Sequence, residues 1–158
     1  SRQTLGRPQV APHVAIRALG NLTSGLKDTV RSEQLAAIES AIEELASEEA
    51  LHPPGLPPRF FARFSIAEQE PWIEVVLARA TVVNLWYPFD DDPRTVLIEA
   101  GVEVPSPFQL IENANPSCTF SIPRGPIPGL ARFVEDLFLK LYDGGEEYAL
   151  EIEMCAFE

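Results

Sequence analysis

The chain has 158 residues, of which 46% are hydrophobic and 23% charged, a composition typical of one folded domain. Twelve lysines and arginines against 24 aspartates and glutamates give a net charge of -12, which argues against nucleic acid or an anionic membrane surface as a partner. Two cysteines without metal-binding spacing exclude a disulfide framework and favour a reducing, cytoplasmic setting. No apolar run is long enough for a membrane span, and the first thirty residues do not resemble a signal peptide.

Residues 1–30 are expected to form a loosely attached extension, with weak helical character over Pro12–Leu19, and residues 31–158 a single domain. A helix is predicted from Ser32, a suitable N-cap, to the proline pair Pro53-Pro54, which a helix cannot pass. Its apolar residues recur at steps of three and four and are Leu35, Ile38, Ile42 and Leu45.

Three short segments rich in aromatic and β-branched residues follow, at 60–66, 72–78 and 81–87, and they predict an antiparallel meander. In the first segment, apolar residues alternate with the set Phe61, Arg63 and Ser65, as in a sheet with one packed face. The third segment has apolar residues on both faces, because Val82 and Trp86 flank Asn84 on the side opposite Val83 and Leu85.

The run Asp90-Asp91-Asp92-Pro93 predicts the start of a short helix that ends near Gly101. A strand pair is expected at 108–112 and 118–122, a helix at 126–142, and a half-buried strand at 148–155. The predicted fold class is therefore α+β: an antiparallel sheet with helices packed on one side, in the order helix, three strands, helix, two strands, helix, strand.

The residues that could support catalysis are few. A hydrolytic nucleophile needs an adjacent base, but His13 falls in the extension and His52 in the proline connector, while Cys118 and Cys155 fall at strand positions typical of small buried residues. We therefore expect no enzymatic activity, no catalytic residue and no cofactor, with a cysteine–histidine site as the alternative.

Acidic residues offer two further candidate sites, each with a structural alternative. Asp90, Asp91 and Asp92 either cap the following helix or hold a weakly bound divalent ion, although they lack the ligand pattern of an EF-hand. Four glutamates near the C-terminus are either paired carboxylates for general acid–base catalysis or the solvent face of the final strand. These are Glu146, Glu147, Glu151 and Glu153. The structural alternative is favoured in both cases, so no metal site is predicted.

Large aromatic side chains near the meander are either core residues or a surface for a partner. Core positions are the default for such rings, but a strand that is apolar on both faces must be covered by a second element or present a patch, which raises the alternative of a partner surface. The residues predicted to bind a partner are Phe61, Trp72, Trp86, Tyr87 and Phe89.

Several segments resemble the bacterial YbjN-like proteins, which are grouped with the class I type III secretion chaperones as peptide-binding domains. The segments that carry the resemblance are Trp72–Val76 (WIEVV), Tyr87-Pro88 before an acidic turn, Cys118–Pro123 (CTFSIP), Phe133–Phe138 (FVEDLF) and Tyr148–Glu153 (YALEIE). The element order is similar to that of the chaperones, which act as dimers, although the segment Pro93–Ala100 is shorter than the helix that builds their dimer.

The resemblance implies a non-enzymatic, chaperone-like module that holds an extended protein segment against apolar sheet surface or a strand edge. Formation of a homodimer is left as an open alternative. The alternative function is a small acidic immunity or antagonist protein that blocks a specific basic target.

Overall fold

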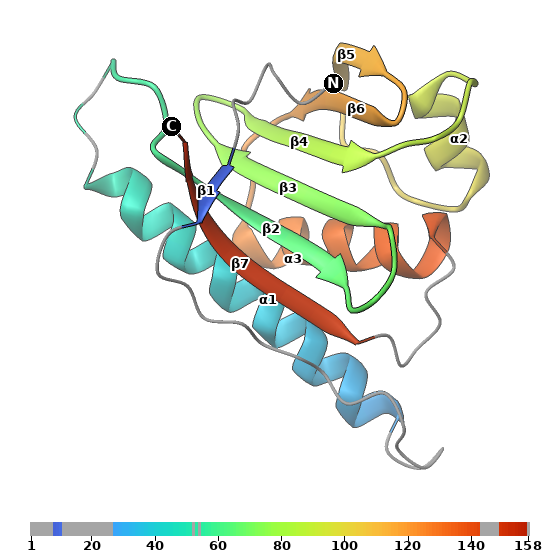
Figure 1. Cartoon of the computed structure of the whole chain (residues 1–158), viewed down its shortest axis with the longest axis horizontal. Coiled ribbons are helices and arrows are strands. Elements are labelled where there is room, and N and C mark those ends of the chain that lie inside the picture. The colour runs from blue at the N-terminus through green and yellow to red at the C-terminus, as the bar shows by residue number, and fades with distance from the viewer. Residues whose placement is uncertain (1–7, 11–26, 52, 54, 143–148, 158) are drawn as a thin grey trace.

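The computed structural model describes residues 8–10, 27–51, 53, 55–142 and 149–157. These residues form one antiparallel sheet with helices packed on one of its faces, which confirms the predicted α+β fold class (Figure 1). The strand order is β1-β7-β2-β3-β4-β6-β5. The strands are β1 (Pro8–Val10), β2 (Phe60–Ile66), β3 (Trp72–Leu77), β4 (Thr81–Trp86), β5 (Gln109–Ala114), β6 (Ser117–Ile122) and β7 (Leu150–Phe157). The helices are α1 (Lys27–Ala50), α2 (Pro93–Glu99), α3 (Ile127–Asp136) and the π-helical turn η3 (Leu137–Leu141).

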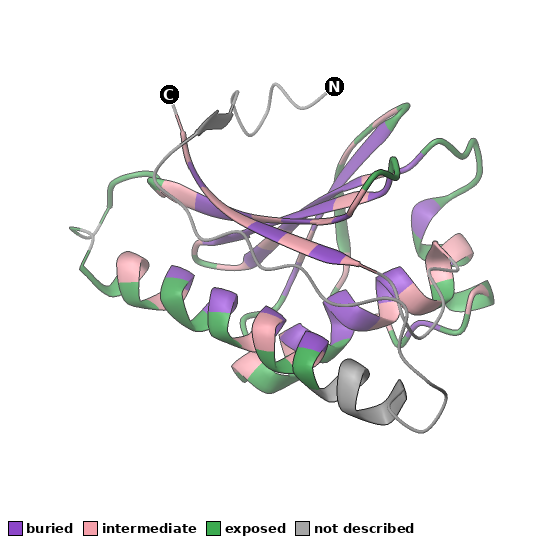
Figure 2. Ribbon diagram, turned by 60° about the horizontal axis from the view of Figure 1, so that its bottom comes forward, coloured by how far each residue is buried: buried purple, intermediate pink, exposed green. Residues whose placement is uncertain are grey.

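The core lies between the sheet and the helix layer formed by α1 and α3 (Figure 2). Alternate residues of each central strand point toward this layer, because side chains in a strand alternate between its two faces. In β2 these residues include Phe64, and in β3 and β4 they include Val75 and Val83, all of which are fully buried. The predicted alternation in the first strand is therefore confirmed.

Helix α1 begins at Lys27, earlier than the predicted start at Ser32, so it crosses the expected boundary between extension and domain. Part of the expected extension, Pro8–Val10, pairs with β7 as strand β1. The predicted helical segment Pro12–Leu19 lies outside the described residues. Local capping signals pointed to Ser32, whereas the structure continues the helix for more than one turn before it.

The last turn of α1 contains Glu48 and Glu49 and no basic residue, which is unfavourable at the negative end of the helix dipole. Arg124, from the segment after β6, compensates: its Nη1 lies 2.9 Å from Glu49 Oε2 and donates at 2.7 Å to the carbonyl of Ala78. This contact joins the end of α1 to the β3–β4 turn.

The short helix α2 begins as predicted. Asp92 is its N-cap and accepts hydrogen bonds from the Thr95 amide at 3.1 Å and the Thr95 hydroxyl at 2.9 Å, while Pro93 occupies the first turn. Gly101 ends the helix with φ of +94°, a conformation that glycine adopts readily. Lys140 Nζ donates to the Gly101 carbonyl at 3.2 Å and thereby joins α2 to the C-terminal helix.

The C-terminal helix was predicted as one continuous element over 126–142, but it changes to π-helical winding at Leu137. The Tyr142 amide donates to the Leu137 carbonyl at 3.1 Å, five residues earlier. This wider turn brings Tyr142 to β4, where its hydroxyl donates to the main-chain oxygen of Trp86. A stripe of apolar residues does not distinguish this winding from a regular α-helix.

Candidate functional site

The sheet face opposite the helix layer carries a row of polar side chains across four neighbouring strands. Arg63 in β2, Glu74 in β3, Asn84 in β4 and Thr119 in β6 are successive cross-strand partners. Arg63 Nη1 donates to Glu74 Oε2 at 2.7 Å, Asn84 Nδ2 donates to Glu74 Oε1 at 3.0 Å, and Thr119 Oγ1 donates to Asn84 Oδ1 at 2.9 Å. We call these four residues the polar ladder.

Three of the four residues of the polar ladder are buried, and its members satisfy one another. Glu74, Asn84 and Thr119 are at most 1% exposed, and each oxygen of the Glu74 carboxylate accepts a hydrogen bond from a neighbouring strand. Because a buried polar group without a partner is costly, this network strongly favours the observed register of the four strands. The geometry is that of a structural network and leaves little access for a substrate or partner.

An apolar cluster lies beside the ladder on the same face. Phe61, Val76 and Cys155 are each at most 3% exposed, with Val82 and Phe157 packed against them. The rings of Phe61 and Phe157 have centroids 4.9 Å apart. The second apolar face of β4 is therefore occupied at Val82 by contacts within this chain.

The five aromatic residues predicted to bind a partner differ in their accessibility. Phe61 and Tyr87 are 1% exposed, so neither presents its ring to a partner in this conformation. Trp72 and Trp86 are half-buried: the Arg63 guanidinium lies 5.1 Å from the Trp72 ring, and the Trp86 and Tyr142 ring centroids are 6.0 Å apart. Phe89 is the most exposed of the five, at 36%, and contacts Tyr87 edge-on at 5.0 Å.

Among the strands whose burial the structure describes, β5 is the most exposed. It lies at one end of the strand order, and Figure 1 shows it on the same side of the molecule as α2. Leu110 is 41% exposed and Ile111 49%, and Gln109 and Asn113 are also exposed. The register to β6 shifts between Leu110 and Glu112, which makes Ile111 the extra residue of a β-bulge. We call Gln109–Asn113 the β5 edge.

A strand is predicted at 108–112 from the sequence, but none of its residues is among the predicted partner-binding residues. The signal that could have found it is the adjacent pair Leu110-Ile111 between Gln109 and Glu112, which interrupts the alternation expected of a half-buried strand. Edge strands with exposed apolar side chains are templates for pairing with another chain.

Acidic residues lie at the Asn113 end of the β5 edge. The main-chain amide of Tyr87 donates at 2.7 Å to the carbonyl of Pro116, in the β5–β6 turn, and the Tyr87 hydroxyl donates at 2.6 Å to the carbonyl of Asp91. One tyrosine therefore connects the turn after β5 to the aspartate run. Asp90, Asp91 and Asp92 are all exposed.

The thiol of Cys118 is not suited to nucleophilic chemistry. Burial, with a smaller contribution from Asp92, raises the pKa of Cys118 from 9.0 to about 12. Burial, followed by Cys118 and the two nearby aspartates, likewise raises the pKa of Tyr87 to about 12. Both groups therefore stay protonated at neutral pH, and the histidines of the alternative cysteine–histidine site, His13 and His52, lie outside the described residues.

Cys118 in the native protein is expected to react with iodoacetamide at pH of about 7.5 more than about a hundredfold more slowly than in urea, because a higher pKa leaves less thiolate. Peptide mapping by mass spectrometry follows Cys118 and Cys155 separately. Native labelling of Cys118 at the rate seen in urea would contradict a buried, protonated thiol.

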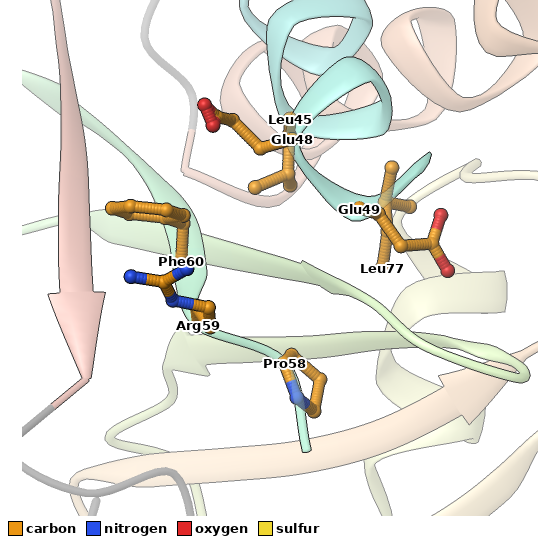
Figure 3. A pocket seen from close by; sticks show the side chains of 7 residues that line it. All are labelled: Leu45, Glu48, Glu49, Pro58, Arg59, Phe60 and Leu77. Carbon is orange, nitrogen blue, oxygen red and sulfur yellow. The ribbon is translucent and has the colours of Figure 1, made fainter. Parts of the chain in front are cut away.

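A small hollow lies between the end of α1 and the start of β2. Its volume is about 20 Å³, which suits a single water molecule and is far below the size of a substrate pocket. Figure 3 shows its lining residues, which are Leu45, Glu48, Glu49, Pro58, Arg59, Phe60 and Leu77.

Within the described part of the chain, no three His, Cys, Asp or Glu residues are grouped so that they could hold a metal ion. None of the described helices combines the length and the apolar character needed to cross a membrane. Comparisons with protein families, curated proteins and solved structures give no match to this chain.

Proposed function

We propose that this protein is a non-enzymatic peptide-binding module that holds an extended segment of a partner as an added strand on the β5 edge. The observation that carries this proposal is the exposure of Leu110 and Ile111, 41% and 49%, on a strand at the end of the sheet. Strand addition satisfies the main chain of an extended peptide by pairing it with a sheet edge, and side chains on the edge then select the peptide.

The β5 edge is a better candidate than the sheet face opposite the helices. On that face the polar ladder forms hydrogen bonds within the chain, and Phe61, Val76 and Cys155 are already buried. A partner would have to displace these contacts, whereas Leu110 and Ile111 are already exposed.

The resemblance to the YbjN-like and secretion-chaperone proteins supports the same class of function, since it implies the binding of extended polypeptide. We propose a cytoplasmic location, because Cys118 and Cys155 are buried and form no disulfide, as expected in a reducing setting.

The rival function, an acidic antagonist of a basic enzyme, has one observation in its favour. Residues 33–50 of α1 contain six glutamates and no lysine or arginine. A complex with this surface would depend on α1 and on charge, so glutamine substitutions at the exposed residues Glu43 and Glu44 would weaken it.

To test the proposal, a display library of random twelve-residue peptides is panned on the whole chain, and selected peptides are measured by fluorescence anisotropy. The double variant Leu110→Gln, Ile111→Gln is expected to bind them at least about tenfold more weakly, because two apolar contacts are lost. Leu51→Gln with Leu56→Gln is the matched control: both leucines are exposed, in the connector before β2, and three strands lie between β2 and β5 in the sheet.

The selected peptides also report on main-chain pairing. N-methylation of every second residue of the peptide is expected to abolish binding when it blocks the amides that face β5. N-methylation of the intervening residues is expected to be tolerated, because only one edge of the peptide pairs with β5. A library that yields no peptide sensitive to the β5 variant would overturn the proposal.

A further inference from the structure

We infer that the partner of the β5 edge is a cationic strand: an extended segment that is basic at one end and apolar at the other, with the basic end beside the β5–β6 turn. This inference rests on the proposed function and specifies its ligand. It follows from the distribution of charge and apolar surface along β5.

The segment that contains the β5 edge is strongly acidic. Residues 88–117 include six acidic residues and one basic residue, Arg94. Asp90, Asp91, Asp92, Glu99 and Glu103 are all exposed, and the β5 strand itself has no lysine or arginine. A partner strand placed here enters a negative potential, which attracts lysine and arginine and disfavours aspartate and glutamate.

The charge and the apolar surface lie toward different ends of the strand. Leu110 and Ile111 are exposed in the first half of β5, whereas the aspartate run is joined through Tyr87 to Pro116, just after its end. Cys118, the cross-strand partner of Asn113, is close enough to Asp92 for this carboxylate to contribute to its raised pKa. The aspartates are thus within electrostatic reach of the Asn113 end.

The direction of the bound strand follows from the rest of the sheet. Every strand pair in this sheet is antiparallel, and antiparallel pairing is slightly more favourable than parallel pairing. An antiparallel partner places its N-terminal half beside Asn113 and its C-terminal half beside Leu110. The expected ligand is therefore basic in its N-terminal half and apolar in its C-terminal half.

A second copy of this chain fits the same edge less well. Pairing two β5 edges would bring two acidic 88–117 segments together, on chains that each carry a net charge of -12. A cationic strand instead gains from both the apolar contact and the charge.

Three labelled ten-residue peptides test the inference on the whole chain. In the first, a half that alternates lysine with threonine precedes a half that alternates valine with threonine. The second has the two halves exchanged, and the third has glutamate in place of lysine. At about 0.05 M salt we expect the first to bind about tenfold more tightly than the second and about a hundredfold more tightly than the third.

Protein variants locate the charge. Asp90→Asn with Asp91→Asn is expected to weaken binding of the first peptide about tenfold at about 0.05 M salt, with the difference largely gone at about 0.5 M salt. Asp92 is left intact because it caps α2. The matched control is Glu43→Gln with Glu44→Gln on α1, which removes the same charge from a different surface and should leave binding within about twofold.

The outcomes separate this inference from the proposed function. If panning selects peptides that need Leu110 and Ile111 but are neutral or acidic, the cationic ligand is wrong and strand binding stands. If no peptide depends on the β5 edge, both fail. Equal weakening by the α1 control pair, or self-association in sedimentation that Leu110→Gln with Ile111→Gln abolishes, would also overturn the inference.

Discussion

Replacement of Phe120 by alanine is expected to lower the free energy of unfolding by about 4 kcal/mol, which would lower the melting temperature by about 10 °C. Phe120 is fully buried in β6, stacks on Phe108 at 4.6 Å and meets Phe133 of α3 edge-on at 6.2 Å. The substitution leaves a cavity and removes two aromatic contacts at once. Urea unfolding followed by tryptophan fluorescence measures the loss.

The same substitution affects the proposed site, because Phe108 directly precedes β5. Without its stacking partner, the start of β5 loses an anchor, and peptide affinity should fall together with stability. Phe89→Ala is the matched control: Phe89 is 36% exposed, so we expect a loss of about 1 kcal/mol. Phe120→Leu retains most of the volume and should cost about 1.5 kcal/mol. A loss below about 1.5 kcal/mol for Phe120→Ala would contradict its central place in the core.

The overall architecture could be predicted because its signals are local. Alternation in 60–66, the aspartate–proline start of α2 and the apolar stripe of the C-terminal helix each report a periodicity or cap that is written in neighbouring residues. The early start of α1 at Lys27 and the π-helical turn after Asp136 depend on contacts with distant elements, such as Tyr142 with Trp86. These contacts are not visible in a local pattern.

The predicted partner-binding residues illustrate the same limit. Aromatic residues at strand positions could be identified, but whether Phe61 or Phe89 is covered depends on which strands lie beside it. Phe61 is adjacent to Cys155, which is more than ninety residues away in the sequence. Likewise, Leu110 and Ile111 are exposed because β5 ends the strand order, and strand order is a tertiary property.

Substitution of Glu74 by alanine is expected to destabilise the protein by about 3 kcal/mol. It leaves the fully buried Asn84 amide without the acceptor that lies 3.0 Å away, and it removes the carboxylate 2.7 Å from the Arg63 guanidinium. Arg63 retains some access to water, with 24% of its side chain exposed, so the larger part of the cost falls on Asn84. Glu99→Ala, an exposed glutamate of α2, should cost less than about 0.5 kcal/mol in the same urea titration.

A double-mutant cycle shows whether the cost of Glu74→Ala reflects broken hydrogen bonds in the ladder. The double variant Glu74→Leu, Asn84→Leu removes donor and acceptor together and replaces them with apolar side chains, although it leaves Thr119 without its acceptor. Because an unsatisfied buried group costs more than a satisfied pair contributes, the losses of the single variants Glu74→Leu and Asn84→Leu should together exceed the loss of the double variant by about 1 kcal/mol. Strict additivity, or a loss for Glu74→Ala no larger than that for Glu99→Ala, would mean that the ladder does not hold the strands in register.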